Sequence, residues 1–259
     1  VCEILDARIP ISSRNPDIDA ICGKKPRMVI LNRIDMADAD LVSRWSNYFK
    51  GKGMAVIRTD CKSRKGINTF APAVRQLLSE KLQRYAEKGQ VGRPLKLMVV
   101  GIPNVGKSTF INQIAGRKGA KAENRPGVTR GKQWVNVDGG LLLLDTPGIL
   151  WPKFDDPEVG MRLAYTGAVK DDILDTETLG CHLMELLARE YPQALVERYK
   201  IEIPTKIDGW ELLQAAGRKR GFLISGGEVD TERMARVLLE EYRSCKLGTF
   251  TLERPEELA

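Results

Sequence analysis

The sequence predicts an α/β fold in which a mostly parallel sheet carries helices on both faces and is followed by a smaller, all-helical domain. Three observations support this prediction. Short apolar runs alternate with helical patterns through the first part of the chain, one such run leads through a glycine-rich loop into a helix, and no strand longer than a few residues is predicted after Pro157. We therefore expect one domain over residues 1–165 and a helical domain over residues 166–259.

The first ninety residues alternate between apolar runs typical of buried strands and segments with helical apolar spacing. The expected strands span residues 1–5, 28–31 and 55–57, and the expected helices span residues 18–22, 41–49 and 67–86. This alternation favours parallel pairing, because each crossover helix returns the chain to the same end of the sheet.

The remaining elements continue this pattern and then change it. A strand at residues 97–100 precedes a glycine-rich loop and a helix that starts near residue 109, and residues 133–137 and 141–144 form a hairpin around Asp138-Gly139-Gly140. Helices are expected at residues 177–189, 211–216 and 232–242, separated by prolines and by a glycine pair. The hairpin adds one antiparallel strand to the sheet, and the later helices form the second domain.

The glycine-rich loop carries the strongest motif in the chain. Residues 101–108, Gly-Ile-Pro-Asn-Val-Gly-Lys-Ser, fit G-x-x-x-x-G-K-S, in which backbone N–H groups and a helix N-terminus bind phosphates. Lys107 is expected to reach the outer phosphates, and Ser108 to offer its hydroxyl to Mg²⁺. The expected phosphate-binding residues of this loop are Asn104, Val105, Gly106, Lys107, Ser108 and Thr109.

A second phosphate motif ends the hairpin. Asp145-Thr146-Pro147-Gly148 matches D-x-x-G, in which the aspartate holds Mg²⁺ through water and the glycine N–H meets the γ-phosphate. Thr129 lies between the two phosphate motifs and is the candidate for completing the Mg²⁺ shell; the alternative is an ordinary loop threonine. The expected metal-binding residues are therefore Ser108, Thr129 and Asp145.

Two segments at strand ends resemble motifs that read guanine. Asn32-Arg33-Ile34-Asp35 resembles N-K-x-D, whose aspartate accepts from guanine N1–H and N2–H₂, a donor pair that adenine lacks. Asn32 is expected to fix the loop and approach N7. Arg33 replaces the usual lysine, and its planar group can stack on a base. Asp60-Cys61-Lys62 occupies the place of S-A-K, whose backbone touches guanine O6. Without this second segment, Asn32 to Asp35 could equally be a polar strand end.

The order of these motifs is unusual. In ordinary GTPases the base-reading motifs follow the phosphate loop, whereas here they precede it. A chain that contains every element in a rotated order indicates circular permutation, which folds tolerate when the original termini lie close together.

This order, together with Asp6-Ala7-Arg8-Ile9-Pro10 and the loop at residues 101–108, resembles the RbgA/YlqF family of circularly permuted ribosome-assembly GTPases. The resemblance covers nearly the whole chain, since residues 167–174 and 217–221 are similar to that family's helical C-terminal domain. It implies a circularly permuted P-loop GTPase domain, GTP and GDP as ligands, Mg²⁺ as cofactor, and action in late assembly of the large ribosomal subunit.

The resemblance also bears on catalysis. Many GTPases place a glutamine after D-x-x-G to orient the attacking water, but this chain has Ile149 there, as the family does. We therefore expect slow hydrolysis until another group positions the water, with Lys107, Thr129, Gly148 and Ile149 around the reacting phosphate. The family implies a histidine in an N-terminal segment that this sequence does not include. His182, on an expected helix of the second domain, is more typical of a surface or packing residue.

Asn104 has two interpretations. In related GTPases an asparagine at this point of the loop helps to hold K⁺, which supplies positive charge to the transition state. The alternative is a structural loop asparagine.

Basic residues in the second domain suggest a polyanionic partner. Arginine and lysine contacts to phosphates give salt-dependent, sequence-independent binding. By resemblance the partner is the large subunit, through rRNA and ribosomal protein; the alternative is a solvated basic helix face. The candidate RNA-binding residues are Arg218, Lys219, Arg220, Arg236 and Arg243.

Composition sets broader limits. The 259 residues carry a net charge of +7 and a pI near 9.1, which modestly favours polyanions. No apolar run approaches the ~20 residues of a membrane span. The five scattered cysteines indicate neither a zinc site nor a disulfide framework, which favours a reducing cytoplasm. We expect a monomer. Because the sequence begins at Val1, within an apolar run and without a methionine, we also expect a preceding segment.

Three functions are compatible with these features. The favoured one is a GTPase whose hydrolysis is stimulated by the large-subunit particle. A GTP-gated RNA-binding module with incidental turnover is the alternative, kept open by Ile149. An organellar or small-subunit relative ranks lower, because the sequence has no cluster of cysteines and histidines and no evident β-barrel extension.

Overall fold

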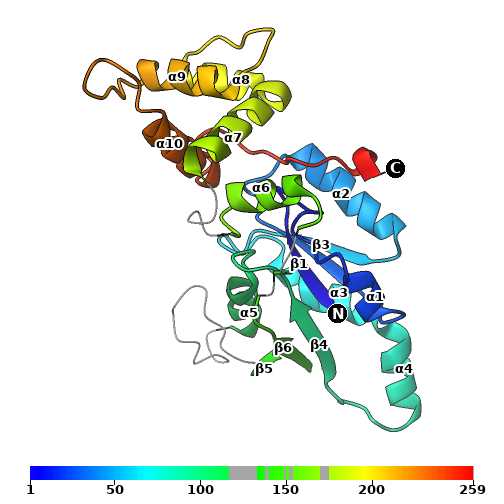
Figure 1. The fold of residues 1–259 in the computed structure, drawn as a ribbon. Helices are drawn as coiled ribbons and strands as arrows, with labels where there is room; N and C mark the ends of the chain where they lie inside the picture. Colours follow the sequence, from blue (N-terminus) through cyan, green and yellow to red (C-terminus); the bar gives the residue numbers. More distant parts are fainter. Residues whose placement is uncertain (117–132, 138–139, 149, 152–153, 170–174, 259) are drawn as a thin grey trace. The chain divides into compact units, whose positions relative to one another are not determined.

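The computed structural model describes residues 1–116, 133–137, 140–148, 150–151, 154–169 and 175–258. These residues form two compact units (Figure 1), one comprising Val1–Asp155 with Phe250–Ala259 and the other comprising Asp156–Thr249. The expected boundary after residue 165 therefore differs from the observed one at both ends of the helical unit. The helix that starts at Pro157 packs on helical-unit neighbours, and the residues from Phe250 onward hydrogen bond to the first unit.

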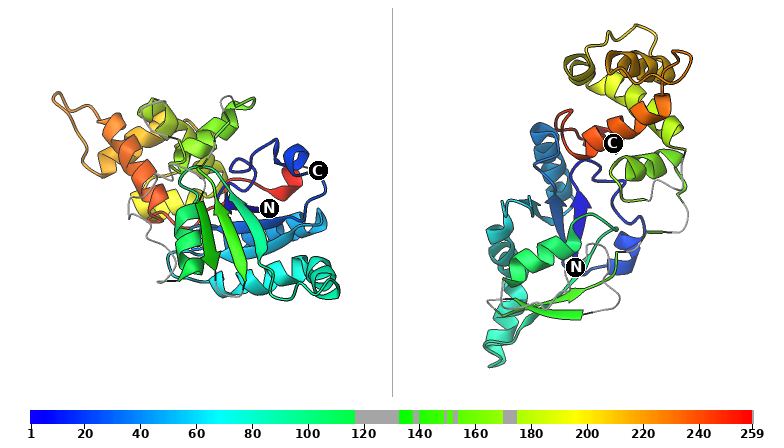
Figure 2. Two further views of the ribbon diagram at one scale, coloured as in Figure 1. Left: turned by 90° about the horizontal axis from the view of Figure 1, so that it is seen from below. Right: turned by 90° about the vertical axis from the view of Figure 1, so that its left-hand side faces the viewer.

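The first unit is built on a six-stranded sheet with the order β3-β2-β1-β4-β6-β5 (Figures 1 and 2). Neighbouring strands are parallel, except that β5 and β6 form an antiparallel hairpin. This confirms the mostly parallel sheet and the hairpin expected from the sequence. The strands are β1 (Cys2–Asp6), β2 (Met28–Asn32), β3 (Ala55–Thr59), β4 (Leu95–Val100), β5 (Gln133–Val137) and β6 (Leu141–Asp145).

The first strand of the chain lies in the middle of the sheet. β1 pairs with β2 over its full length, but it meets β4 only through Cys2 with Val99 and Glu3 with Val100. Every residue of β1 is buried. The base-reading half and the phosphate-binding half of the sheet are therefore joined at β1, as a permuted chain order requires.

Helices of the first unit pack on this sheet. α2 inserts Trp45 and Phe49 against Leu5, Val29 and Leu31, because its apolar residues recur at helical spacing. The helix predicted over residues 67–86 is instead divided at Leu78, whose backbone leaves helical geometry while its side chain stays buried. The helical segments are α1 (Ile18–Cys22), α2 (Ala39–Gly51), η1 (Ile67–Thr69), α3 (Phe70–Leu77), α4 (Ser79–Glu87) and α5 (Lys107–Ala115).

One part of the sheet is less covered than the rest. β4 alternates between buried residues and the exposed Lys96 and Met98, and Trp134 on β5 is half exposed. Within the described residues, one face of the β4–β6–β5 half is therefore open, whereas β1 and β2 are buried on both faces.

The second unit consists of five described helices, of which α7, α9 and α10 confirm the three expected ones. Four helices begin at aspartates whose carboxylates accept a backbone N–H of the first turn. Gly180 allows close packing, since a Cβ there would lie 2.4 Å from the Ala235 Cβ. The helices are α6 (Pro157–Tyr165), α7 (Thr176–Glu190), α8 (Pro192–Tyr199), α9 (Gly209–Lys219) and α10 (Thr231–Arg243).

A buried carboxylate ties three of these elements together. Glu241 of α10 accepts hydrogen bonds from Arg198 Nε at 3.0 Å, Tyr199 Oη at 2.9 Å and Arg220 Nη2 at 2.9 Å. Burial acts to raise the pKa of Glu241, but these hydrogen bonds lower it to about 2. The Glu241 charge is therefore part of the packing of the helical unit.

We expect this carboxylate to make the helical unit sensitive to acid. Because the folded pKa lies below the usual value of 4.5, the stabilisation is complete above about pH 5 and is lost as the pH falls toward 2. The shift corresponds to roughly 3 kcal/mol. Urea unfolding at several pH values should show a shallower acid dependence for Glu241→Gln than for the exposed control Glu240→Gln. An equal dependence in both variants would contradict this account.

None of the helices in the described part of the chain combines the length and apolar character needed to cross a membrane.

Candidate nucleotide-binding site

The sequence motifs all lie at one edge of the sheet. The loops that follow β1, β2, β3, β4 and β6 leave from the carboxyl ends of parallel strands, where open α/β sheets bind their ligands. The last residues of these strands and the loops that follow them contain Asp6 to Pro10, the base-reading segments, the phosphate loop and D-x-x-G. The fold therefore brings together motifs that are separated by more than a hundred residues in the chain.

The phosphate loop connects β4 to α5 through a constrained backbone. Asn104 and Gly106 both have positive φ values, of 59° and 95°. A Cβ at Gly106 would lie 2.4 Å from Asn32 Nδ2, so only glycine fits this position without displacing the asparagine. Val105 is buried beneath the loop, whereas Asn104, Ser108 and Thr109 are exposed.

Lys107 and Asp145 meet at the start of α5. Their Nζ and Oδ1 atoms are 2.9 Å apart, and both side chains are largely buried. Phosphate oxygens would draw the ammonium group away from this pair, while Mg²⁺ would take the carboxylate. An oxygen set of Asp145 and the Ser108 hydroxyl suits a hard cation such as Mg²⁺. The residues present therefore fit the expected magnesium and phosphate ligands.

D-x-x-G runs directly against the phosphate loop. A Cβ at Gly148 would lie 2.9 Å from the Pro103 nitrogen and 3.0 Å from its Cα, which are backbone atoms that cannot move aside easily. Gly148 is thus placed beside the loop in which a γ-phosphate would sit. The other two residues expected in this region, Thr129 and Ile149, lie outside the described residues.

Asn32 joins three loops of the site. Its Nδ2 donates to the Val105 carbonyl at 2.9 Å, and its Oδ1 accepts from Thr59 Oγ1 at 3.1 Å and from the Cys61 N–H at 3.3 Å. The side chain is buried, so these bonds replace water contacts that it has lost. Asn32 therefore fixes the base-reading loop against the phosphate loop.

The carboxylates of the two base-reading segments are close enough to influence each other. Partial burial and the neighbouring Asp60 raise the pKa of Asp35. Burial also acts on Asp60, but hydrogen bonds from Ser63 and from the Lys62 N–H, at 2.8 Å, lower the pKa of Asp60. The Asp35 side chain still reaches solvent, so two guanine N–H donors could approach it and offset the repulsion from Asp60.

Arg33 serves as a bridge in this structure. Its Nη2 donates to the Asn104 carbonyl at 2.5 Å, and its Nη1 lies 3.7 Å from Asp6 Oδ2. Asp6 is itself held by Arg8 through hydrogen bonds of 2.9 and 2.8 Å. The arginine that replaces the usual lysine thus connects the base-reading loop to the phosphate loop. Sequence reasoning assigned no role to Asp6 or Arg8, although their position after a strand was a usable signal.

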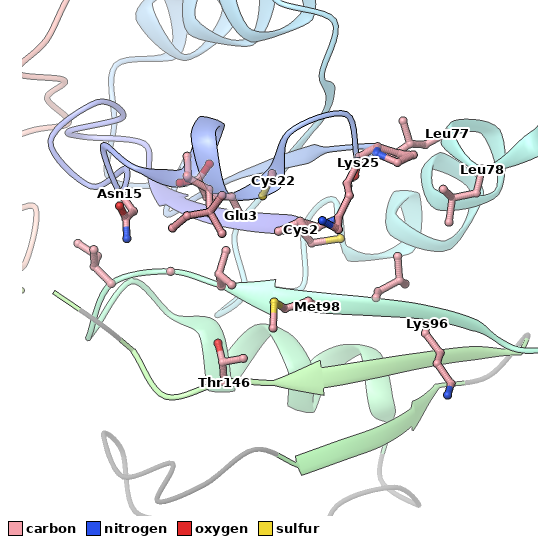
Figure 3. Close-up of a pocket in the computed structure, with 18 of the residues that line it drawn as sticks. Cys2, Glu3, Asn15, Cys22, Lys25, Leu77, Leu78, Lys96, Met98 and Thr146 are labelled. Carbon is pink, nitrogen blue, oxygen red and sulfur yellow. The ribbon is translucent and has the colours of Figure 1, made fainter. Parts of the chain in front are cut away.

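A mainly apolar cleft of about 720 Å³ is lined by residues of β1, β4, α1 and α3 (Figure 3). Cys2 of β1, Met98 of β4 and Leu77 of α3 contribute to its wall. Lys107, Asp145, Asn32 and Asp35 do not line it. Gly101 and Ile102 of the phosphate loop and Thr146 and Pro147 of D-x-x-G do line it, so the cleft borders the candidate nucleotide site.

The candidate RNA-binding residues differ in their surroundings. Arg218 and Lys219 are exposed at the end of α9. Arg220 binds Glu241 and lies over the Tyr199 ring, and Arg243 donates to the carbonyls of Tyr165 and Ala164 at 3.0 and 2.7 Å. Arg236 pairs with Glu232 on the surface. His182 is half exposed on α7, with Nδ1 3.9 Å from Glu185 Oε2.

A parallel sheet with these loops at its carboxyl edge, and with the base-reading loops ahead of the phosphate loop in the chain, defines a circularly permuted P-loop GTPase. Residues 96–202 match the family model described as 50S ribosome-binding GTPase. Similar curated proteins include ribosome biogenesis GTPase A and mitochondrial ribosome-associated GTPase 1, so hydrolysis of GTP is the activity of this class.

The similar proteins narrow the class to one family. The chain is 47% identical over 259 residues to ribosome biogenesis GTPase A of Priestia megaterium, which covers 99% of this chain and 89% of the relative. It is 33% identical to mitochondrial ribosome-associated GTPase 1 of Mus musculus, over 98% of this chain and 83% of the relative. The chain belongs to the ribosome biogenesis GTPase A family.

Solved structures agree with this assignment. A GDP-bound structure of TM YlqF superposes with a TM-score of 0.70 at 26% identity and covers 98% of this chain and 95% of that one. GNP-bound YlqF from T. maritima gives a TM-score of 0.66 at 27% identity, over 98% and 92% of the two chains.

Proposed function

We propose that this GTPase acts in late assembly of the large ribosomal subunit in the cytoplasm, and that the particle stimulates its hydrolysis. The observation that carries the proposal is the convergence of base-reading and phosphate-binding loops through Asn32, in a chain that has Ile149 where a water-orienting glutamine is common. Such a site is equipped to bind GTP but needs an outside group to orient water. The names of the relatives make a ribosomal particle the best source of that group.

Each site residue then has a distinct role. The backbone N–H groups of the phosphate loop and Lys107 neutralise the phosphates, and Ser108 and Asp145 hold Mg²⁺, with Thr129 completing its shell. The Gly148 N–H meets the γ-phosphate. Asp35 accepts from guanine, while the Cys61 and Lys62 backbone borders its O6. Asn104 is the candidate K⁺ ligand, supported by its exposed position at the turn of the loop.

The test is GTP turnover in potassium buffer, with and without purified large subunits. Strong stimulation by large subunits and little by small subunits is the expected result, and replacing K⁺ by Na⁺ should reduce it. If turnover is unchanged by particles while GTP-dependent binding persists, the alternative of a GTP-gated RNA-binding module is correct. Ile149, which can neither donate nor accept a hydrogen bond, is the feature that favours this alternative.

RNA contact should depend on the exposed end of α9. We expect the double variant Arg218→Ala/Lys219→Ala to weaken particle binding and to reduce the slope of log affinity against log salt by about 2, since each phosphate contact contributes nearly 1. The matched control is Arg189→Ala, at an exposed arginine in the last turn of α7 that is not among the candidate RNA-binding residues. The measurement is particle binding from 50 to 200 mM salt. If the double variant has the same slope as the unmodified protein, Arg218 and Lys219 do not contact RNA phosphates.

A further inference from the structure

The end of the chain returns to the base-reading side of the first unit. We call residues 250–253 the strap. Its backbone donates from the Phe250 N–H to the Met36 carbonyl at 3.1 Å, in the loop after β2. It donates again from the Leu252 N–H to the Arg8 carbonyl at 2.7 Å, in the loop after β1. The strap therefore connects the loop after β1 to the loop after β2, which carries Asp35.

Thr251 connects the same two loops through its side chain. Its Oγ1 donates to the Ala7 carbonyl at 3.1 Å and accepts from the Asp38 N–H at 3.2 Å. Asp38 also caps α2 by accepting from the Leu41 N–H. One buried hydroxyl thus fixes the start of α2 relative to the loop after β1.

Glu253 anchors the strap. Its carboxylate is buried and accepts from the backbone N–H of Ile11 at 2.6 Å, from that of Ser12 at 3.0 Å, and from the Ser12 hydroxyl. Its carbonyl accepts from Trp45 Nε1 at 3.0 Å. The residues that follow the strap, Pro255–Leu258, lie beside α2, near the C-terminus marked in Figure 1. A buried carboxylate with several donors is a fixed point, because losing them would leave an unpaired charge.

Along the chain, Asp35 is preceded by a residue held by the phosphate loop and followed by residues held by the strap. Asn32 is fixed by Thr59, Cys61 and Val105, whereas Met36 and Asp38 are held by the strap. Asp35 lies between these two anchors. A carboxylate that must meet guanine N1–H and N2–H₂ together tolerates little displacement, since both hydrogen bonds need good geometry.

We propose that the strap positions Asp35 for guanine recognition, with Thr251 and Glu253 as positioning residues. The inference rests on the proposed role of Asp35. It makes base selectivity, rather than phosphate binding, depend on residues that are more than two hundred positions away in the sequence.

A purely structural role for the strap predicts a different result. Loss of folded protein lowers the apparent affinity for every nucleotide equally. A displaced Asp35 instead weakens the binding of GDP more than that of IDP. The base of IDP, hypoxanthine, lacks the 2-amino group that forms the second hydrogen bond. The ratio of the IDP dissociation constant to that of GDP is therefore the informative quantity.

The experiment measures GDP and IDP binding by competition with a fluorescent GDP in the full chain. We expect Thr251→Val, which keeps the shape and removes the hydroxyl, to lower the ratio by about three- to tenfold, as loss of one well-placed hydrogen bond would. Thr251→Ser, which keeps a hydroxyl at this position, should leave the ratio close to that of the unmodified protein. Glu253→Gln should lower it as well, and the matched control Glu256→Gln, on an exposed glutamate that pairs with Arg44, should change it less than about twofold.

The outcomes separate the two proposals. If Asp35→Asn leaves the ratio unchanged, the guanine assignment fails, and the strap inference fails with it. If Asp35→Asn changes the ratio but Thr251→Val does not, the strap inference alone is overturned. Circular dichroism shows which variants are folded. If Glu253→Gln unfolds, the comparison of Thr251→Val with Thr251→Ser still tests whether the strap positions Asp35.

Discussion

Replacing Gly106 with alanine is expected to raise the GDP dissociation constant at least about 100-fold. The added Cβ would stand 2.4 Å from Asn32 Nδ2, at a backbone φ of 95° that side chains rarely adopt. Asn32 cannot swing away without breaking its bonds to Val105, Thr59 and Cys61. Backbone strain and the lost hydrogen bonds together cost about 3 kcal/mol, and each 1.4 kcal/mol changes affinity tenfold.

Gly116 provides the matched control at the other end of α5. It also has a positive φ, of 67°, but among the described residues a Cβ there would have no atom within 4 Å. Gly116→Ala therefore carries the backbone strain without the collision. Calorimetric titration of both variants with GDP should give a small effect for Gly116→Ala and a large one for Gly106→Ala. Equal effects would mean that strain alone, and not the contact with Asn32, sets the affinity.

The sequence contained enough local information to predict the motif-bearing part of the fold. β2, β4 and β6 are short apolar runs that end directly in polar motifs, so each strand and its loop could be placed together. The phosphate loop was identifiable because its chemistry needs consecutive residues at fixed spacing. Asn32 and Val105 could be expected near each other only through the order of the strands, which the permuted motif order implied.

The features that the sequence did not predict depend on contacts between distant residues. Glu253 bonds to Ile11 and Ser12 across more than two hundred residues, and nothing in the segment around Glu253 marks it as part of the first unit. The division of the helix at Leu78 follows from burial of that side chain, which a helical pattern alone does not reveal. Likewise, Arg220 and Arg243 look like free basic residues in the sequence, but both bind acceptors inside the helical unit.

Arg33 departs from the N-K-x-D motif but still makes contacts that join two loops of the candidate site. A lysine at this place would present one compact charge, whereas the guanidinium spans from the Asn104 carbonyl to Asp6. Arg8 holds the same Asp6, so the two arginines share one buried carboxylate that neutralises part of their charge. The base-reading loop, the phosphate loop and the loop after β1 therefore form one connected network, to which the strap adds its bonds from the far end of the chain.

Replacing Asp35 with asparagine is expected to exchange guanine for xanthine as the preferred base. In the proposed site the carboxylate accepts from guanine N1–H and N2–H₂, and an asparagine would turn a donor toward the 2-amino group. Xanthine has a carbonyl at that position, which the amide can instead satisfy. Hydrogen bonds to a charged group contribute about 1.5–3 kcal/mol each, so losing them should weaken GDP binding by roughly 100-fold or more.

Asp60 provides the comparison for the assignment of Asp35 as the carboxylate that accepts from guanine. It is the neighbour whose charge raises the pKa of Asp35, but its own oxygens accept from the Lys62 N–H and from Ser63. Asp60→Asn should therefore weaken the binding of GDP modestly and gain no affinity for XDP. Asp35→Asn should instead bind XDP more tightly than GDP. If XDP affinity appears in Asp60→Asn instead, the second base-reading segment, and not the first, reads the 2-position of the purine.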